Sequence, residues 1–212
     1  DHIFDETSYE FDPDKVRSGQ TVFVKTDFLG FFLEKYFPKI SQPFVLITHN
    51  SDAPIPGSYA GVLKEKNIIA WFGQNVEGMV HHKLHPIPIG VANQRWPHGN
   101  IKTFKSLRQR AGYGVKKVLA YLNFELKTHP IRSVVHQYFK KLKFCKAEAK
   151  RKFEDYLLDM SQSQFVISPR GNGLDCHRTW ESLLMGSYPI IQSSASDCLF
   201  NGLPVVIVSD WD

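Results

Sequence analysis

A short segment near the C-terminus combines the side chains and the spacing needed to hold an anion. The apolar run Phe165–Ile167 predicts a buried strand, and Pro169 cannot continue a central strand, so the chain must turn there. In the loop that follows, Arg170 offers a planar fork of donors. Gly171 and Gly173 remove β-carbons that would keep backbone amides away from an oxygen-rich ligand. Phosphate is the ligand that this chemistry indicates.

A helix is expected directly after this loop, beginning near Cys176. Asp175 can cap that helix, and its free N–H groups and positive dipole end would face the loop. Arg178 and Glu181 are three residues apart and share a face, one able to meet phosphate and the other able to accept ribose hydroxyl protons. A structural interpretation stays open, because glycine turns before capped helices are common and this pair could form a surface ion pair of little energetic value.

The same segment resembles the donor-binding segment of exostosin-like glycosyltransferases, a family with the GT-B architecture. The likeness runs from Ser168-Pro169-Arg170-Gly171 through Arg178 and Glu181 to Gly186-Ser187-Tyr188-Pro189-Ile190-Ile191, and Ser182 stands where that pattern usually has alanine. A looser likeness covers residues 44 to 99. The resemblance implies arginines on the diphosphate of a sugar donor and a glutamate on its ribose. The donor-binding residues expected on this basis are Arg170, Gly171, Asn172, Gly173, Asp175, Arg178 and Glu181.

The resemblance also implies an inverting sugar transfer from a nucleoside-diphosphate sugar to a glycan or glycoprotein hydroxyl, with no metal or other cofactor required. A catalytic base should then project from the first domain. The loop after the strand Phe44–Thr48 supplies Asp52, our first candidate, and His49, our second, while Asp27 follows an earlier strand. The alternative is that residues 50–52 only shape a turn. By analogy alone, UDP-xylose is the first choice of donor, ahead of glucuronic acid and galactose donors.

The composition of the 212 residues indicates a globular protein, and its net positive charge suits anionic partners. Apolar residues make up 42% and aromatic residues 13%, enough for a core, and the formal charge is +5. The three cysteines show no paired framework, which favours a reducing compartment. We expect a soluble, cytoplasmic protein, because no apolar run could span a membrane and no signal-like start is present. A Golgi location remains open if an N-terminal anchor preceded Asp1.

Strands alternating with helices predict an α/β fold in which two Rossmann-like parallel-sheet domains face a central cleft, as in GT-B enzymes. We expect an acceptor-side domain at residues 1–110 and a donor-binding domain at residues 111–212, with a linker at Trp96–Lys116. Asp27 is expected to cap a helix that ends near Tyr36. Other strands are expected at Thr21–Lys25, Ile68–Phe72, Pro86–Val91, Val118–Leu122 and Val205–Val208, and other helices at Tyr59–Glu65, Ile131–Lys141 and Ala147–Met160.

Three further patterns allow different functions. Asp210 and Asp212 follow a strand and could hold a divalent metal, as in the GT-A class of glycosyltransferases, whereas Asp12-Pro13-Asp14 fits a solvated turn. His81 and His85 would share a face of a helix and could suggest a metal site, but Pro86 and Pro88 shorten that helix and no H-E-x-x-H motif is present, so we expect a structural or surface role for His81, His82 and His85. The basic stretch 140–152 fits a solvated face or a peripheral membrane contact, and no nucleic-acid partner is expected. A non-catalytic nucleotide-sugar-binding module is the remaining alternative.

Overall fold

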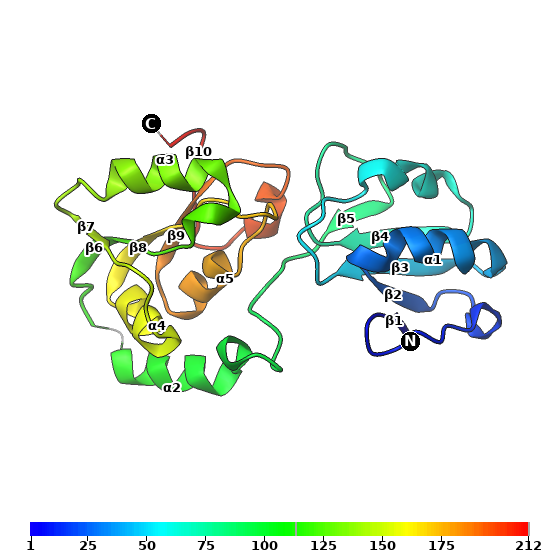
Figure 1. Cartoon of the computed structure of the whole chain (residues 1–212), viewed down its shortest axis with the longest axis horizontal. Coiled ribbons are helices and arrows are strands. Elements are labelled where there is room, and N and C mark those ends of the chain that lie inside the picture. Colours follow the sequence, from blue (N-terminus) through cyan, green and yellow to red (C-terminus); the bar gives the residue numbers. More distant parts are fainter. Residues whose placement is uncertain (113, 212) are drawn as a thin grey trace. The chain divides into compact units, whose positions relative to one another are not determined.

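The computed structural model describes residues 1–112 and 114–211, which form two compact units, Asp1–Ile89 and Gly90–Asp212 (Figure 1). Each unit contains a five-stranded sheet in which all the neighbouring strands are parallel. This confirms the α/β class and the two Rossmann-like halves. The division falls earlier than the expected boundary near residue 110, because residues 101–111 form a helix that packs within the second unit.

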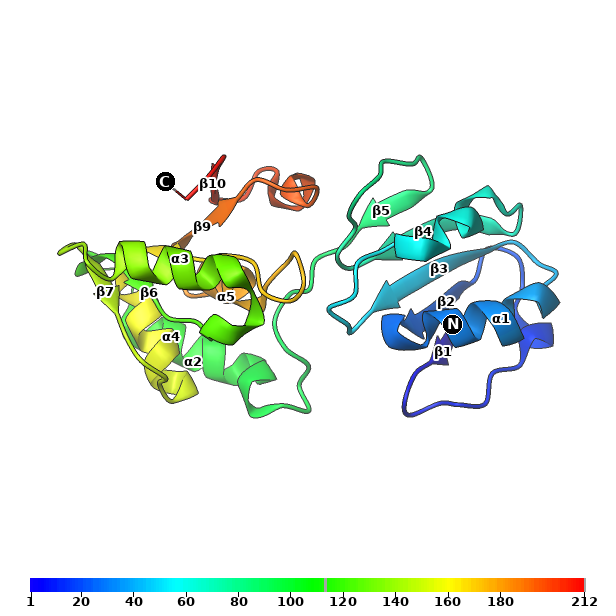
Figure 2. The same cartoon turned by 45° about the horizontal axis from the view of Figure 1, so that its top comes forward.

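The first unit is a sheet with its strands in sequential order, β1-β2-β3-β4-β5. Its hydrophobic cluster gathers on one face, where alternate residues of the strands meet helical residues such as Leu29, Phe32 and Leu63. Figure 2 shows α1 lying against this sheet. The elements are β1 (His2–Phe4), η1 (Pro13–Lys15), β2 (Thr21–Lys25), η2 (Thr26–Phe28), α1 (Leu29–Lys35), η3 (Phe37–Lys39), β3 (Phe44–His49), η4 (Gly57–Lys64), β4 (Ile68–Gly73) and β5 (Leu84–Pro86).

The second unit has the strand order β10-β9-β8-β6-β7. The chain therefore leaves β6 toward one edge of the sheet, returns past it to β8, and continues in the opposite direction. Its elements are η5 (Pro97–Gly99), α2 (Ile101–Ala111), β6 (Val118–Leu122), η6 (Leu126–Thr128), α3 (Pro130–Phe139), β7 (Cys145–Ala147), α4 (Phe153–Ser161), β8 (Ser163–Ile167), α5 (His177–Leu184), β9 (Tyr188–Gln192), η7 (Asp197–Phe200) and β10 (Val206–Val208).

Helices cover both faces of the second sheet, with α3 on one side and α2 and α4 on the other (Figure 1). Two separate apolar clusters match this arrangement. On one face Tyr121 and Val166 pack with residues of α2 and α4, and on the other Leu122 and Ile167 pack with Val135 of α3. Because successive side chains of a strand point to opposite faces, adjacent apolar residues of β6 and β8 serve both layers.

The reversal of strand order between β6 and β8 defines a topological switch point in the second unit. In such sheets the loops at the carboxyl ends of the two central strands diverge, and ligands bind in the crevice between them. The loops concerned begin at Asn123 and Ser168. The sequential order of the first sheet contains no such reversal.

Several sequence-based boundaries are wrong. The expected linker Trp96–Lys116 contains α2, whose amphipathic spacing buries Phe104 and Leu107 despite flanking glycines. The expected strand Pro86–Val91 is replaced by β5, which ends at Pro86. The expected helix Ala147–Met160 begins only at Phe153. Its first expected residue, Ala147, is instead the last residue of strand β7.

Asp27 does not cap the helix that follows it. It lies inside η2, its carboxylate accepts a hydrogen bond from the Ser51 hydroxyl, and it forms an ion pair with Lys25 at 3.4 Å. The first residue of α1, Leu29, is preceded by Phe28, which makes no side-chain cap. The Asp27 carboxylate oxygen that could have capped the helix accepts the hydrogen bond from the distant residue Ser51 instead.

Replacing Gly73 with alanine should destabilise the first unit. A β-carbon at Gly73 would lie 2.0 Å from Ile55 Cδ1 and 2.6 Å from Thr48 Oγ1, which accepts the buried indole N–H of Trp71. We expect the free energy of unfolding to fall by about 1–3 kcal/mol in urea titrations. Gly61→Ala is the matched control, because its β-carbon would meet nothing within 4 Å. Equal stabilities of the two variants would contradict this account.

Candidate functional site

Arg132, on α3, holds the loop that follows β8. Its side chain is buried, with 6% of the residue exposed. Its Nε donates to the carbonyl oxygen of Arg170 at 2.8 Å, its Nη1 to that of Glu125 at 3.0 Å, and its Nη2 to that of Pro169 at 3.4 Å. Its Nη2 also lies 3.6 Å from Cys176 Sγ. The three carbonyl acceptors carry no formal charge, so their bonds fix two loops without forming an ion pair.

Gly171 is required by this arginine. A β-carbon on Gly171 would lie 2.8 Å from Arg132 Nη2 and 3.7 Å from Thr128 Oγ1. The sequence interpretation assigned this glycine to the approach of a ligand to the backbone. The structure adds a reason that operates without any ligand, because a larger residue would push the loop away from the guanidinium that holds it.

Arg178, near the start of α5, lies across an aromatic ring from Arg132. Its Nε donates to the carbonyl oxygen of Asn123 at 3.0 Å, and its Cζ lies 5.1 Å from the centre of the Phe124 ring. Arg132 Cζ lies 5.5 Å from the same ring. The buried Nη1 of Arg178 has no hydrogen-bond partner among residues 1–112 and 114–211, and within these ranges neither guanidinium forms an ion pair. The switch point thus holds two guanidiniums that form no ion pair within the described chain, although Glu181 interacts with Arg178, and Glu125 with Arg132, over a longer distance.

The surrounding electrostatics are positive as well. Burial lowers the pKa of the Arg132 guanidinium, and the charge of Arg178 lowers it further. Burial also lowers the pKa of His129, with smaller contributions from Arg170 and Arg132. Lysines and arginines number 18 in residues 90–212, against 10 aspartates and glutamates, whereas residues 1–89 carry 8 against 11. The second unit therefore has a formal charge of +8 and the first of −3, which favours an anionic ligand for the second.

Glu181 lies one turn further along α5 and is buried. Its Oε2 accepts a hydrogen bond from the Tyr156 hydroxyl at 2.8 Å, and burial raises the pKa of its carboxyl. Within the described residues it forms no ion pair with Arg178, so the surface ion pair considered from the sequence is absent. Its second oxygen, Oε1, accepts no hydrogen bond from the described chain and is not fully buried.

Asp175 acts differently from the predicted cap. The capping position of α5 is Cys176, which makes no side-chain cap. Asp175 Oδ1 accepts from the Cys176 amide at 2.8 Å, and its carboxylate also accepts from the indole N–H of Trp180 at 2.8 and 3.0 Å. His177 donates from Nδ1 to the carbonyl of Gly90 at 2.7 Å. These contacts anchor the first turn of α5.

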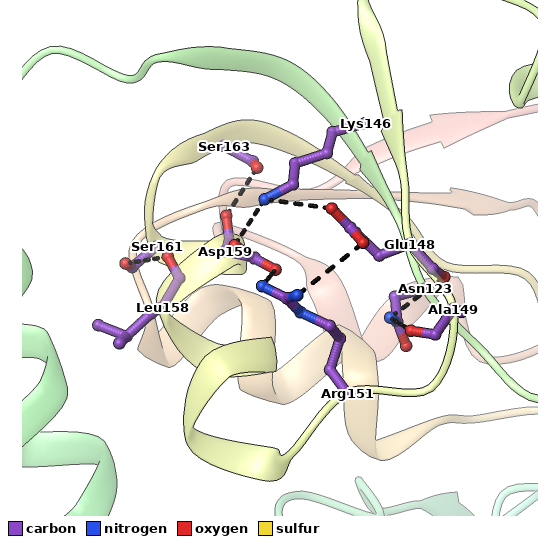
Figure 3. A network of polar contacts seen from close by, with 9 residues as sticks. All are labelled: Asn123, Lys146, Glu148, Ala149, Arg151, Leu158, Asp159, Ser161 and Ser163. Carbon is purple, nitrogen blue, oxygen red and sulfur yellow. Dashed lines mark hydrogen bonds and ion pairs between the residues drawn. The ribbon is translucent and has the colours of Figure 1, made fainter.

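The carbonyl that binds Arg178 belongs to a residue that is itself held in place. Asn123 Nδ2 donates to the carbonyl oxygens of Ala149 at 2.8 Å and Glu148 at 3.3 Å, as Figure 3 shows. The loop at the end of β6 is thereby tied to the loop at the end of β7. The position of Arg178 depends on this chain of backbone contacts.

An ion-pair network fixes the second of these loops. The buried Asp159 on α4 pairs with Lys146 at 2.7 Å and with Arg151 at 3.0 Å, and both cations also pair with Glu148, at 3.5 and 4.0 Å (Figure 3). Part of the basic stretch 140–152 is therefore neutralised within the unit. Its expected membrane contact remains a prediction that would involve other lysines.

The expected catalytic residues lie at the carboxyl end of β3 in the first unit. His49 Nε2 donates to the carbonyl of Pro88 at 3.0 Å, and its Nδ1 lies 3.0 Å from Asn50 Oδ1, so both ring nitrogens are engaged. Asp52 is exposed, three residues beyond the strand. Asp27 is held by Ser51 and Lys25. Asp52 and Asp27 are both exposed, as a base for an incoming hydroxyl must be, and Asp52 stays our first candidate.

Within residues 1–112 and 114–211, no group of three or more His, Cys, Asp or Glu residues is placed to hold a metal. His81 stacks on His82 with ring centroids 4.4 Å apart, and His85 stacks on Phe72. Asp12 caps the short helix η1. Asp210 accepts from the Trp211 amide, and Asp212 lies outside the described residues.

The cysteines Cys145, Cys176 and Cys198 are free, as expected. In the described part of the chain, no helix has the length and apolar character needed to cross a bilayer.

Compared with known proteins, the chain matches no protein-family model and no curated protein sequence. The function must therefore be argued from the arrangement of its own residues. Of the expected donor-binding residues, those between Arg170 and Glu181 do lie on one loop and one helix at the switch point.

Sequence reasoning missed three residues of this site, Arg132, Phe124 and Tyr156. A signal existed for Arg132, because it lies three residues before the buried Val135 and therefore on the apolar side of α3. A charged residue on such a face is rarely buried without a structural or functional reason. Phe124 and Tyr156 carried no comparable signal, since aromatic residues at strand ends and on helices most often belong to the core.

Replacing Tyr156 with phenylalanine should destabilise the protein in a pH-dependent manner. Burial already holds the pKa of Glu181 above its unfolded value, so ionisation of this carboxyl lowers stability as pH rises through the folded pKa. The Tyr156 hydroxyl offsets part of that cost, and its removal should raise this pKa further. We expect a loss of about 1–2 kcal/mol in the free energy of unfolding at pH 8, and a smaller loss at pH 4.5.

Denaturant unfolding at the two pH values measures this difference. Tyr138→Phe is the control, because the Tyr138 side chain is 52% exposed on α3. A loss that is equal at both pH values would show that the hydroxyl does not act through the charge of Glu181.

Proposed function

We propose that this protein is an inverting glycosyltransferase that uses a nucleoside-diphosphate sugar, with its donor bound by the second unit. The observation that carries the proposal is the pair of guanidiniums, Arg132 and Arg178, which lies at the β6/β8 switch point without an ion-pair partner in the described chain. A buried charge is costly unless it is paired or hydrogen-bonded. A bound diphosphate would supply the missing counter-charge.

The position of these arginines supports a diphosphate ligand. Ligands of open parallel sheets bind beyond the carboxyl ends of the strands at a switch point, and the loops at Asn123 and Ser168 begin there. The buried Nη1 of Arg178 supplies a donor that no described residue uses. The start of α5 adds backbone N–H groups at the same place. Arg132 acts mainly by holding the loop, since three of its hydrogen bonds go to carbonyls and the fourth goes to Cys176 Sγ, just ahead of α5.

Glu181 supports a nucleoside rather than a simple phosphate ester. An ionised carboxylate only accepts hydrogen bonds, so Tyr156 fixes Oε2 and leaves Oε1 for a second donor. A ribose hydroxyl is a suitable hydrogen-bond donor to Oε1, because Glu181 lies three residues from Arg178 on α5. The three-residue separation of Arg178 and Glu181 would then match adjacent diphosphate and ribose groups.

The transfer step requires a nucleophile, a leaving group and a base. The acceptor hydroxyl oxygen forms a bond to the anomeric carbon, the bond from that carbon to the diphosphate oxygen breaks, and its electron pair leaves with the diphosphate. Arg178 and the amides of the loop would stabilise the growing negative charge. The hydroxyl proton passes to a base, and Asp52 is our candidate because it is exposed at the end of β3.

The finer assignments rest on the resemblance to exostosin-like glycosyltransferases. On this basis we assign a GT-B arrangement with a central cleft and a glycan or glycoprotein acceptor. We also assign a donor whose binding requires no divalent metal, and UDP-xylose is the first donor to test. The two all-parallel sheets are compatible with that arrangement. The charge difference between the two units is compatible with an anionic donor on the second unit.

Donor binding can be tested by thermal stabilisation, because a ligand that binds only the folded state raises its melting temperature. A panel of nucleotide sugars, led by UDP-xylose, should raise the melting temperature of the wild-type protein equally in EDTA and in Mn²⁺. Arg178→Ala should abolish that shift, since it removes the buried Nη1, which has no hydrogen-bond partner within residues 1–112 and 114–211.

The control for this experiment is Arg110→Ala, which removes an exposed arginine from the last turn of α2. A shift that requires Mn²⁺ would favour the metal-dependent alternative at Asp210 and Asp212. No shift with any nucleotide sugar would overturn the proposed donor site.

Catalysis by the first unit can be tested with Asp52→Asn. If Asp52 is the base, the variant should keep its donor affinity and lose on the order of 100-fold or more in kcat. Asp14→Asn, at another exposed aspartate of the same unit, should keep normal turnover. Normal turnover of Asp52→Asn would remove this residue from the mechanism. Donor binding by a wild-type protein that neither transfers nor hydrolyses any sugar would instead favour a non-catalytic binding module.

A further inference from the structure

Trp96 differs from the other tryptophans of the chain in its exposure. Trp71 and Trp211 are buried, and Trp180 binds Asp175 through its indole N–H. Trp96 is 52% exposed, although it lies in the second unit ahead of α2. The flat surface of an exposed indole is suited to stacking against a planar ligand.

The turn that carries Trp96 has a fixed backbone. The Trp96 amide donates to the carbonyl of Asn93 at 2.9 Å, and the Gly99 amide donates to the carbonyl of Trp96 at 2.9 Å. Gly99 is buried, and a β-carbon there would lie 2.1 Å from the Asn93 carbonyl oxygen. The aromatic surface is therefore presented by a closely packed turn, which lowers the entropy lost when a ligand binds.

The Trp96 ring lies next to two other flat side-chain groups, the His98 ring and the Arg95 guanidinium. Its ring is nearly parallel to that of His98, with an interplanar angle of 14° and centroids 6.2 Å apart. The guanidinium carbon of Arg95 lies 5.7 Å from the Trp96 ring centre. Aromatic rings and guanidinium planes are the groups on which nucleobases stack in proteins.

A continuous series of ring contacts leads from this group to Glu181. His98 meets Phe153 edge-on at 5.9 Å, and Phe153 stacks on Tyr156 at 6.1 Å. Tyr156 in turn donates its hydroxyl to Glu181. Burial raises the pKa of the Glu181 carboxyl, and the charge of His98 is the smallest of the effects that oppose this rise. All of these residues belong to the second unit, so the series does not depend on the placement of the first.

We propose that Trp96 and His98 form the subsite for the nucleobase of the bound nucleotide. This inference rests on the proposed function, because it continues the same ligand beyond its ribose. The diphosphate lies at Arg178, the ribose at Glu181, and the base extends from the ribose to the exposed aromatic pair. Since stacking uses the flat face that every base has, this subsite recognises a nucleoside by its ring and discriminates weakly between uracil and other bases.

Calorimetric titration with UDP and with inorganic pyrophosphate separates this subsite from the diphosphate site, because pyrophosphate has no base. Trp96→Ala should weaken UDP binding on the order of tenfold and leave pyrophosphate binding unchanged. Trp96→Phe, which keeps an aromatic ring, should recover most of the UDP affinity. Tyr138→Ala, at an aromatic residue of the same 52% exposure on α3, should change neither affinity.

The possible outcomes distinguish this inference from the function on which it rests. If the wild-type protein binds neither ligand, the proposed donor site is wrong and the subsite with it. If it binds both and Trp96→Ala binds UDP normally, the subsite is overturned while the donor site stands. An equal loss for UDP and pyrophosphate would also overturn it, because Trp96 would then support the diphosphate site or the fold. Melting temperatures of the variants identify any loss of folding.

Discussion

The buried guanidinium of Arg132 is the constraint on which the geometry of the candidate site in the second unit depends. Its three hydrogen bonds to carbonyl oxygens join the loop after β6 to the loop after β8, which come from different parts of the chain. A guanidinium can do this because its donors form a rigid fork. The bonds satisfy its hydrogen-bonding needs without an ion pair in the described chain. The requirement for glycine at position 171 follows from this arrangement.

The two units solve the packing of a parallel sheet in different ways. The second covers both faces with helices and reverses its strand order between β6 and β8, which separates two loops at the carboxyl edge. The first keeps its strands in sequential order and gathers its hydrophobic cluster on one face. Ile69 in β4 and Ile3 in β1 accordingly remain 46% and 54% exposed. Only the second sheet has the topology that generates a binding crevice by itself.

Much of the fold was predictable because local patterns dominate it. The apolar, β-prone residues of Thr21–Lys25, of Phe44–His49 and of the run before Pro169 identify strands from sequence. In the structure, burial alternates along the first two of these strands. Errors arose where a long-range contact replaced a local preference. Ser51 draws the Asp27 carboxylate away from α1, and Trp180 together with the Cys176 amide occupies Asp175. The segment 101–111 looked polar and broken, yet burying two apolar residues against α4 was enough to make it a helix.

The sequence by itself determined the loop with Arg170, the helix with Arg178 and Glu181, and the parallel α/β class, because these depend on residue type and short spacing. Only the tertiary structure decided which distant residues complete the candidate site. Arg132 reaches it from α3, Asn123 from the end of β6, and Tyr156 from α4. Spacing along the chain carries no information about such meetings. They are set by strand order and by the need of each buried polar group to find a partner.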